Sequence, residues 1–408
     1  MTKHSKPWGY HDSKENVSSR NLHPQTLAVR GGLERTGFGE TSEALFLNSG
    51  FTYHSAAQAE ASFADEEEHY LYSRFGNPTV SMFEQRLAAI EGAEACIASA
   101  TGMSAMFTSL ACLVSSGDRV VASKSMFSSC YVVLTQILPR WGVEVELVAG
   151  NEKSDWERAL SKPAKAVFIE TPSNPLLGIL DVRMIADLAK SAGALFIVDN
   201  VMATPVLQKP LELGADVVMY SATKHIDGQG RVLGGAILGS SDYIDNHVKP
   251  FARHTGPALS PFNAWVMLKS LETLNMRVKQ MSESAHFIAE QLSNHKLVER
   301  VYYPFLDSHP GSQLAKSQMS GGGSTLAIAL KGGKEQAFNL LDRLEVIDIS
   351  NNLGDSKTLM THPASTTHKS LGPEAMKEMG IGENMLRLSV GLEHPDDLVQ
   401  DLILALEK

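Results

Sequence analysis

The chain has 408 residues, of which 43% are apolar and 20% charged, and its formal net charge is −10. These proportions are typical of a folded globular protein, and the length predicts two or three domains. The negative charge argues against a nucleic-acid partner, and no apolar run approaches the roughly 18 residues of a transmembrane helix, so we expect no membrane partner. The amino terminus lacks the apolar stretch of a signal peptide, so we expect a cytoplasmic protein.

The amino-terminal stretch is rich in polar residues and glycine, which predicts an extended arm that packs on another subunit. From about residue 80 to 240, helical and strand-like segments alternate, which is typical of a parallel sheet with crossover helices. A long helical stretch over residues 260–292 then leads to further apolar strands over 325–330 and 385–390. The boundaries that we expect are an arm over residues 1–62, an α/β domain over 63–262 and a smaller α+β domain over 263–408.

Three apolar, strand-like runs end in residues that can do chemistry. Glu170 and Asp199 follow directly on two of these runs, and Lys224 follows the third, between the hydroxyl residues Ser221 and Thr223 and a glycine-rich loop. Ligands of parallel α/β sheets bind at the carboxyl ends of the strands. We therefore expect these polar side chains to converge on one edge of the sheet.

Lys224 is placed for covalent chemistry with an aldehyde cofactor, which requires a neutral amine in a partly dry site. The hydroxyls of Ser221 and Thr223 can bind an anion, and an acidic group such as Asp199 can keep the ring nitrogen of pyridoxal protonated. Taken singly, a lysine is more often a solvated surface residue and an aspartate a helix cap. The combination predicts pyridoxal 5′-phosphate as the cofactor.

A second anion site is predicted around Gly102 and Met103, where small residues lie between a strand and a helix. Backbone N–H groups at such a junction can point at a phosphate, although ordinary helix capping explains the same pattern. The glycines after Lys224 do not have the dinucleotide-binding spacing, and no P-loop motif is present. The three cysteines form no Cys-x-x-Cys pair, so we expect no metal.

Four motifs make the chain resemble the Cys/Met-metabolism family of pyridoxal-phosphate enzymes. They are residues 72–79 (YSRFGNPT), 170–175 (ETPSNP), 221–224 (SATK) and 387–393 (RLSVGLE). The resemblance runs from about residue 20 to the end, and residues 253–263 and 351–355 are similar to the homoserine-ester sulfhydrylases within that family. It implies the aspartate-aminotransferase-like fold, fold type I, with a mostly parallel sheet in a large α/β domain and a smaller α+β carboxyl-terminal domain.

The resemblance also implies how the cofactor is bound. Lys224 would hold it covalently, Asp199 would pair with its pyridine nitrogen, and Phe127 would stack on its ring. Many family members have tyrosine at the position of Phe127, and phenylalanine can stack but cannot donate a proton. The residues implied to bind the phosphate are Ser221, Thr223, Gly102 and Met103.

For the substrate and the assembly, the resemblance implies a further set of residues. Arg387 would grip the substrate carboxylate through two hydrogen bonds, Asn174 would lie beside it, and Thr367 would help to seat it. Tyr72 and Arg74 match residues that reach the cofactor phosphate of a neighbouring subunit. The implied assembly is a homotetramer built as a dimer of dimers.

The reaction that the resemblance implies is γ-replacement on a small molecule in methionine biosynthesis. A homoserine ester, succinyl or acetyl, and sulfide would give homocysteine and the free acid, with Lys224 removing the α-proton and Tyr72 or Lys224 protonating the leaving group. Cystathionine γ-synthase and methionine γ-lyase activities share these steps and remain alternatives. A catalytically silent oligomeric binding protein is the alternative from another class, which the presence of Lys224, Asp199 and Arg387 disfavours.

Overall fold

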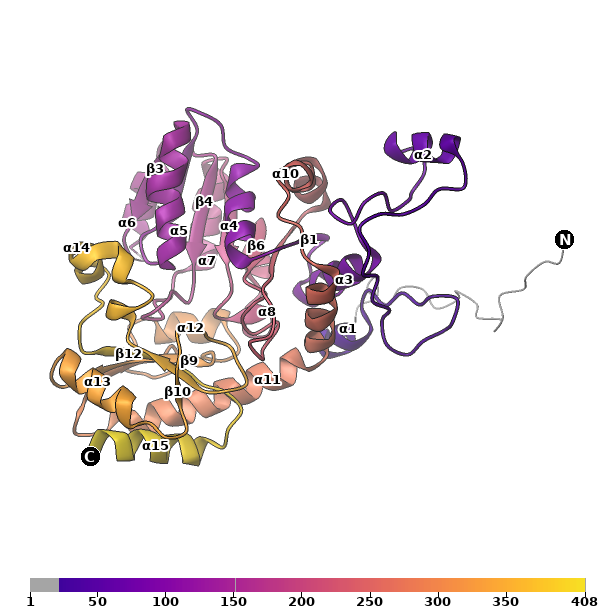
Figure 1. Ribbon diagram of the computed structural model, residues 1–408. Coiled ribbons are helices and arrows are strands. Elements are labelled where there is room, and N and C mark those ends of the chain that lie inside the picture. The colour runs from indigo at the N-terminus through magenta and orange to yellow at the C-terminus, as the bar shows by residue number, and fades with distance from the viewer. Residues whose placement is uncertain (1–21, 151, 408) are drawn as a thin grey trace.

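The computed structural model describes residues 22–150 and 152–407. They form a large part around a seven-stranded sheet and a smaller part around a five-stranded sheet, and the long helix α11 (Pro261–Ser293) runs from one to the other (Figure 1). Leu268 and Leu271 of this helix lie in the core of the large part, whereas Ile288 and Leu292 lie in the core of the smaller one. The helical stretch predicted over residues 260–292 is therefore confirmed, and it bridges the two parts.

The large sheet is mostly parallel, as predicted. Its strands, in spatial order, are β1 (Ala95–Ser99), β7 (Gly235–Gly239), β6 (Val217–Tyr220), β5 (Leu195–Asp199), β4 (Ala166–Glu170), β2 (Arg119–Ser123) and β3 (Glu144–Val148). Strand β7 runs antiparallel to both of its neighbours, and all other pairs are parallel. The carboxyl ends of β4, β5 and β6 therefore lie along one edge.

Helices cover both faces of this sheet. Strands β4 and β5 are buried almost throughout, with Phe168 and Phe196 packed into separate cores on opposite faces, as expected for continuous apolar runs. Asp181 caps α7 (Val182–Ser191) by accepting a hydrogen bond from the amide of Met184 at 2.9 Å. The helices of this part are α3 (Pro78–Glu91), α4 (Gly102–Ala111), α5 (Ser128–Val132), α6 (Lys153–Ala159), α7 (Val182–Ser191), α8 (Thr204–Leu207), α9 (Ser241–Tyr243) and α10 (Lys249–Thr255).

The smaller sheet is antiparallel except for the pairing of its edge strand β10 with β11. Its strands, in spatial order, are β10 (Asp348–Ile349), β11 (Leu359–Thr361), β12 (Met385–Ser389), β9 (Thr325–Leu330) and β8 (Val298–Tyr302). Its helices are α12 (Ser312–Gln318), α13 (Lys334–Arg343), α14 (Gly372–Glu378) and α15 (Pro395–Glu407). Short 3-10 or π-helical segments occur at Val133–Ile137, Leu138–Trp141, Pro210–Leu213, Ile244–Val248, Pro363–Ser365 and Lys369–Leu371. The α+β character predicted for this region is confirmed.

In Figure 1, part of the segment from residue 22 to α3 extends from the body of the molecule. The arm expected over residues 1–62 lies partly outside the described residues, and from residue 22 onward it contains α1 (Pro24–Arg30) and most of α2 (Ala56–Phe63). Helix α1 lies against α3, where the guanidinium of Arg86 donates to the carbonyl of Gly31 at 2.8 Å. Helix α2 stands away from the body. None of the helices in the described part of the chain has the length and apolar character of a membrane span.

Candidate active site

Lys224 lies just beyond the carboxyl end of β6, and its ammonium nitrogen contacts the smaller part of the molecule. Nζ donates a hydrogen bond of 2.7 Å to Oδ1 of Asn352, in the loop that follows β10. Burial, with the positive charge of Arg387 nearby, lowers the pKa of Lys224 to about 8. Above about pH 8 this amine is therefore mainly neutral, which is the form that reacts with an aldehyde.

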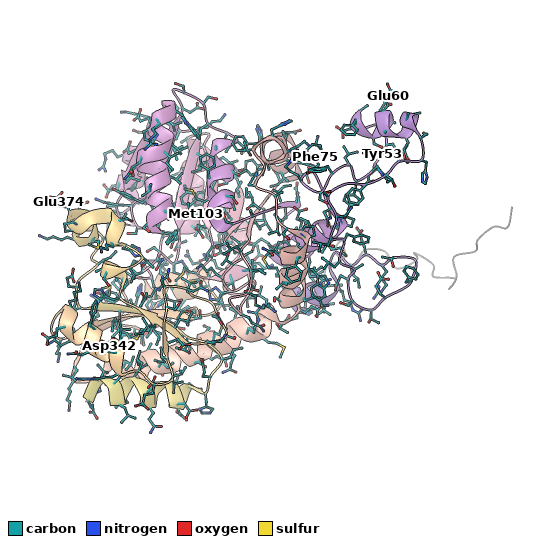
Figure 2. The ribbon with its side chains drawn as sticks, viewed as in Figure 1. Tyr53, Glu60, Phe75, Met103, Asp342 and Glu374 are labelled. Atoms are coloured by element: carbon teal, nitrogen blue, oxygen red, sulfur yellow. The ribbon has the colours of Figure 1, made fainter. Side chains whose placement is uncertain are left out.

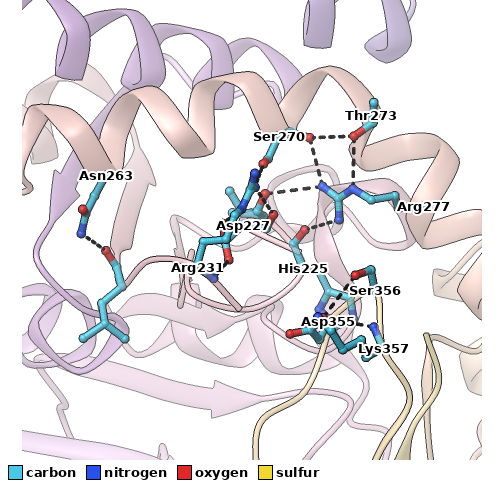
Figure 3. A network of polar contacts seen from close by, with 12 residues as sticks. His225, Asp227, Arg231, Asn263, Ser270, Thr273, Arg277, Asp355, Ser356 and Lys357 are labelled. Carbon is cyan, nitrogen blue, oxygen red and sulfur yellow. Dashed lines mark hydrogen bonds and ion pairs between the residues drawn. The ribbon is translucent and has the colours of Figure 1, made fainter. Parts of the chain in front are cut away.

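The turn that follows Lys224 is held by helix α11, and Figure 3 shows the polar contacts that hold it. Arg277 donates to the backbone carbonyl of His225 at 2.8 Å and to that of Ser270 at 3.0 Å. Gly228 has a φ of +67°, and a Cβ there would overlap the Arg277 guanidinium. The backbone after Lys224 is thus fixed against the helix that joins the two sheets.

Glu170 and Asp199 end the neighbouring parallel strands β4 and β5, and they are partners in the register of that pair. Both are buried, and Oδ1 of Asp199 accepts from the amide of Val201 at 3.0 Å. Burial raises the pKa of both carboxyls, and the proximity of Asp199 raises that of Glu170 further. The convergence predicted for the strand ends is confirmed.

The two oxygens of Glu170 accept hydrogen bonds from different segments. Oε2 accepts from the amide of Phe127 at 2.6 Å, and Oε1 accepts from the amide of Asn174 at 2.7 Å. Next to Phe127, the hydroxyl of Ser128 donates to the carbonyl of Thr367 at 2.7 Å. These hydrogen bonds therefore connect Phe127, Asn174 and the loop that carries Thr367.

Arg387 projects from the middle of β12 and is only 2% exposed. Its terminal nitrogens donate to Oδ1 of Asn174 at 3.1 Å and to the carbonyls of Asn351 and Asn352 at 2.8 and 3.1 Å. Its Nε has no hydrogen-bond partner among the described residues. A buried guanidinium with an unused N–H donor is suited to a carboxylate oxygen, which accepts a charge-assisted hydrogen bond.

The amino terminus of α4 approaches Ser221 closely. Thr101 caps this helix by accepting from the amide of Ser104 at 3.0 Å, and the amides of Gly102 and Met103 have no acceptor within the helix. A Cβ at Gly102 would lie 2.8 Å from Cα of Ser221 and overlap its side chain. These amides and the Ser221 hydroxyl therefore form a compact set of donors for an anion.

Thr223 is less free than Ser221 to join that set. Its hydroxyl accepts from the amide of Gly234 at 3.0 Å and donates to the carbonyl of the same residue at 3.2 Å. A hydroxyl has one proton to donate, so Thr223 can donate to an anion only after its hydrogen bond to the Gly234 carbonyl is broken.

We predict that Gly102→Ala weakens cofactor binding. The added Cβ meets the backbone of Ser221, so the helix terminus must move away from the hydroxyl, and overpacking of this kind costs about 1–3 kcal/mol. The dissociation constant of pyridoxal phosphate, measured by fluorescence titration of the apoprotein, should rise by about tenfold or more. Gly333→Ala is the matched control, because a Cβ there meets nothing within 4 Å, and it should leave this constant unchanged.

Within this chain, Tyr72 and Arg74 contact each other and Phe75. The guanidinium of Arg74 sits 4.7 Å from the ring centroid of Phe75 and donates to the carbonyl of Arg253. Figure 2 shows Phe75 on the side of the molecule that carries the amino-terminal segment, apart from Met103. Among the described residues, no hydrogen bond or ring contact joins Tyr72 or Arg74 to the group around Lys224.

Two further residues make contacts in this group that the sequence does not specify. Asn352 contacts Lys224 directly, and Glu170 links Phe127 to Asn174. The sequence places Glu170 at the end of an apolar strand, as it does Asp199, but indicates no partner for it. Asn352 belongs to residues 351–355, which resemble the homoserine-ester sulfhydrylases, but no local pattern pairs it with Lys224. Within the described parts of the chain, no three His, Cys, Asp or Glu side chains are grouped as a metal site requires.

The comparisons with known proteins agree with this geometry. A family model described as Cys/Met metabolism PLP-dependent enzyme matches residues 25–407. An O-succinylhomoserine sulfhydrylase of Mycobacterium tuberculosis is 57% identical over 385 residues, covering 93% of this chain and 95% of the relative. One of Pseudomonas aeruginosa is 46% identical, covering 92% and 93%.

A solved structure has a similar fold. It is described as a putative O-acetylhomoserine (thiol)-lyase from Campylobacter jejuni with N′-pyridoxyl-lysine-5′-monophosphate. Its TM-score to this chain is 0.91 at 32% identity, and the match covers 95% of this chain and all of the other. Together with the family model and the fold, these likenesses establish that the chain belongs to the Cys/Met metabolism PLP-dependent enzymes, whose cofactor is pyridoxal phosphate.

Proposed function

We propose that the protein catalyses γ-replacement on O-succinylhomoserine, in which sulfide displaces succinate and homocysteine is released. The observation that carries the proposal is the match of two O-succinylhomoserine sulfhydrylases to almost the whole chain. The geometry supports it, because hydrogen bonds connect the half-buried Lys224 and Asn352 with the buried Arg387 and Asn174 in one group. The product belongs to methionine biosynthesis.

The residues present fit pyridoxal phosphate. Ser221 and the amides of Gly102 and Met103 supply the donors that a phosphate needs, and Asp199 is a buried acid at the adjoining strand end. The bound cofactor supplies an electron-withdrawing ring that stabilises negative charge at the substrate's α-carbon. The proposed contacts are the covalent bond to Lys224, the ring nitrogen with Asp199, the ring face with Phe127, and the phosphate with Ser221, Thr223, Gly102 and Met103.

Lys224 is the proposed general base. As the neutral amine, its Nζ takes a proton from the substrate's α-carbon and later returns one to the product. The hydrogen bond to Oδ1 of Asn352 orients Nζ, and the low pKa of Lys224 keeps much of the amine neutral near pH 8. A pKa near the working pH allows the amine both to take up a proton and to release it again.

Arg387 is proposed to hold the substrate's α-carboxylate. Its Nε is the unused donor, and its other contacts to Asn174 and to the Asn352 carbonyl fix the plane of the guanidinium. Thr367 would complete the seat from the loop that Ser128 holds in place. A guanidinium held in place in this way is selective for a carboxylate, because the hydrogen bond from Nε forms without further ordering of the side chain.

The assembly is proposed to be a homotetramer built as a dimer of dimers, with Tyr72 and Arg74 contributing to a neighbouring subunit's site. Tyr72 is 44% exposed, and Leu47, with which it lines one cavity, is 68% exposed. Apolar surface of this kind on an extended segment is suited to contact with another subunit. Tyr72 of the neighbour would then be a candidate for protonating the leaving group, together with Lys224.

Product analysis tests the proposal directly. We predict that the holoenzyme, given O-succinylhomoserine with equal amounts of sulfide and cysteine, forms mainly homocysteine and succinate. Cystathionine as the main product would instead identify a synthase, and an oxoacid with ammonia would identify a γ-lyase. Absence of any product would favour a silent binding protein. Parallel reactions with O-acetylhomoserine measure the preference for the acyl group.

A further inference from the structure

Glu170 is a buried carboxylate that joins two walls of the proposed active site. Its two oxygens accept from the backbone amides of Phe127 and Asn174 at 2.6 and 2.7 Å. These amides belong to different segments, one at the start of α5 and the other in the loop after β4. A single side chain therefore sets the distance between the two segments.

Each of these walls carries a group with a proposed role. Phe127 would face the cofactor ring, and Ser128 next to it holds the carbonyl of Thr367. Asn174 accepts from Arg387, the proposed carboxylate-binding residue, at 3.1 Å. Movement of either amide relative to Glu170 would therefore alter the angle between the bound ring and the bound carboxylate.

The contact uses both oxygens of a carboxyl group. Glutamate offers two acceptor oxygens, whereas glutamine has one oxygen and an NH₂ group that cannot accept. Asp199 lies beside Glu170 in the strand register, and two buried carboxyls at one edge repel each other when both are ionised. A glutamine at this position would avoid that repulsion, but its single oxygen could not accept from both amides. Only a carboxyl group provides an acceptor for each of the two amides.

We propose that Glu170 is a positioning residue that holds Phe127 and the Asn174–Arg387 pair in fixed relative orientation. The inference depends on the proposed function for the identity of the groups that these residues bind. It extends that function by adding a residue that touches neither substrate nor cofactor but determines how the two are presented to each other. Its loss should change geometry within the site rather than remove a binding group.

The test compares Glu170→Gln with Asp401→Asn in the holoenzyme. Asp401, on α15, is a matched control because its buried carboxylate also accepts from backbone amides, those of Val346 and Ile347 at 3.0 Å. We expect Glu170→Gln to raise KM for O-succinylhomoserine by about tenfold, as loss of one buried hydrogen bond implies. The circular dichroism of bound pyridoxal phosphate should weaken in the same variant. Asp401→Asn should lower the melting temperature and leave both readouts unchanged.

Two results would overturn the proposal. One is a Glu170→Gln variant with wild-type KM and wild-type cofactor dichroism. The other is a change in KM and dichroism that is as large in Asp401→Asn as in Glu170→Gln and follows the loss of stability in each variant. If Glu170→Gln does not fold, Glu170→Asp replaces it, because its shorter side chain can reach only one of the two amides and should weaken the dichroism too. The dichroism needs no substrate, so it decides about Glu170 even if the wild type fails to convert O-succinylhomoserine.

Discussion

Replacing Lys224 with alanine should reduce turnover by about 10³-fold or more. The variant lacks the amine that is proposed to move the α-proton, and general-base catalysis alone contributes about 10²–10⁴-fold. It also lacks the nitrogen that binds the cofactor covalently, so the absorption spectrum of the reconstituted protein should be that of a non-covalently bound aldehyde. Steady-state formation of homocysteine and the visible spectrum are the two measurements.

Lys209→Ala is the control for this variant. Lys209 lies in the same part of the molecule and is also partly buried, with Nζ donating to the carbonyl of Ile90 at 2.8 Å. Its loss should lower stability but leave the spectrum and turnover at wild-type values. A Lys224→Ala protein that kept both the covalent spectrum and turnover would contradict the central role given to this lysine.

The part of the site that the sequence could predict lies on the large sheet. Glu170, Asp199 and Lys224 each follow an apolar run, and parallel strands necessarily bring their carboxyl ends to one edge. The small residues around Gly102 could be placed at a strand-to-helix junction for the same reason. These inferences need only the local pattern and the direction of each strand.

The contacts across the two sheets could not be predicted in this way. Asn352 is 128 positions from Lys224, and Arg387 is 213 positions from Asn174. Such pairs depend on how the smaller part packs on the larger one through α11, and no local periodicity encodes that packing. The role of Arg387 in binding a carboxylate was indicated only by the resemblance of its motif to that of the Cys/Met-metabolism family. Its unused Nε became evident only from the three-dimensional contacts.

Replacing Arg387 should raise KM for the homoserine ester far more than it lowers kcat. Arg387→Ala removes the proposed partner of the substrate carboxylate, and loss of a buried, hydrogen-bonded charge pair costs about 3–5 kcal/mol, or roughly 10²–10⁴-fold in kcat/KM. Arg387→Lys keeps the charge but cannot make two parallel hydrogen bonds, so about 10- to 100-fold is expected. Steady-state kinetics over a range of ester concentrations separates KM from kcat.

Arg119→Lys is the matched control for the charge-conserving variant. Arg119 is also buried and donates to the carbonyl of Ala159 at 2.6 Å, but it begins β2 and so lies at the opposite edge of the large sheet. Its replacement should lower the melting temperature without changing KM. An Arg387→Lys enzyme with wild-type KM would show that the carboxylate is bound elsewhere. Since Asn174 and the Asn352 carbonyl would then hold Arg387 for structural reasons alone, the melting temperature should be the property that falls.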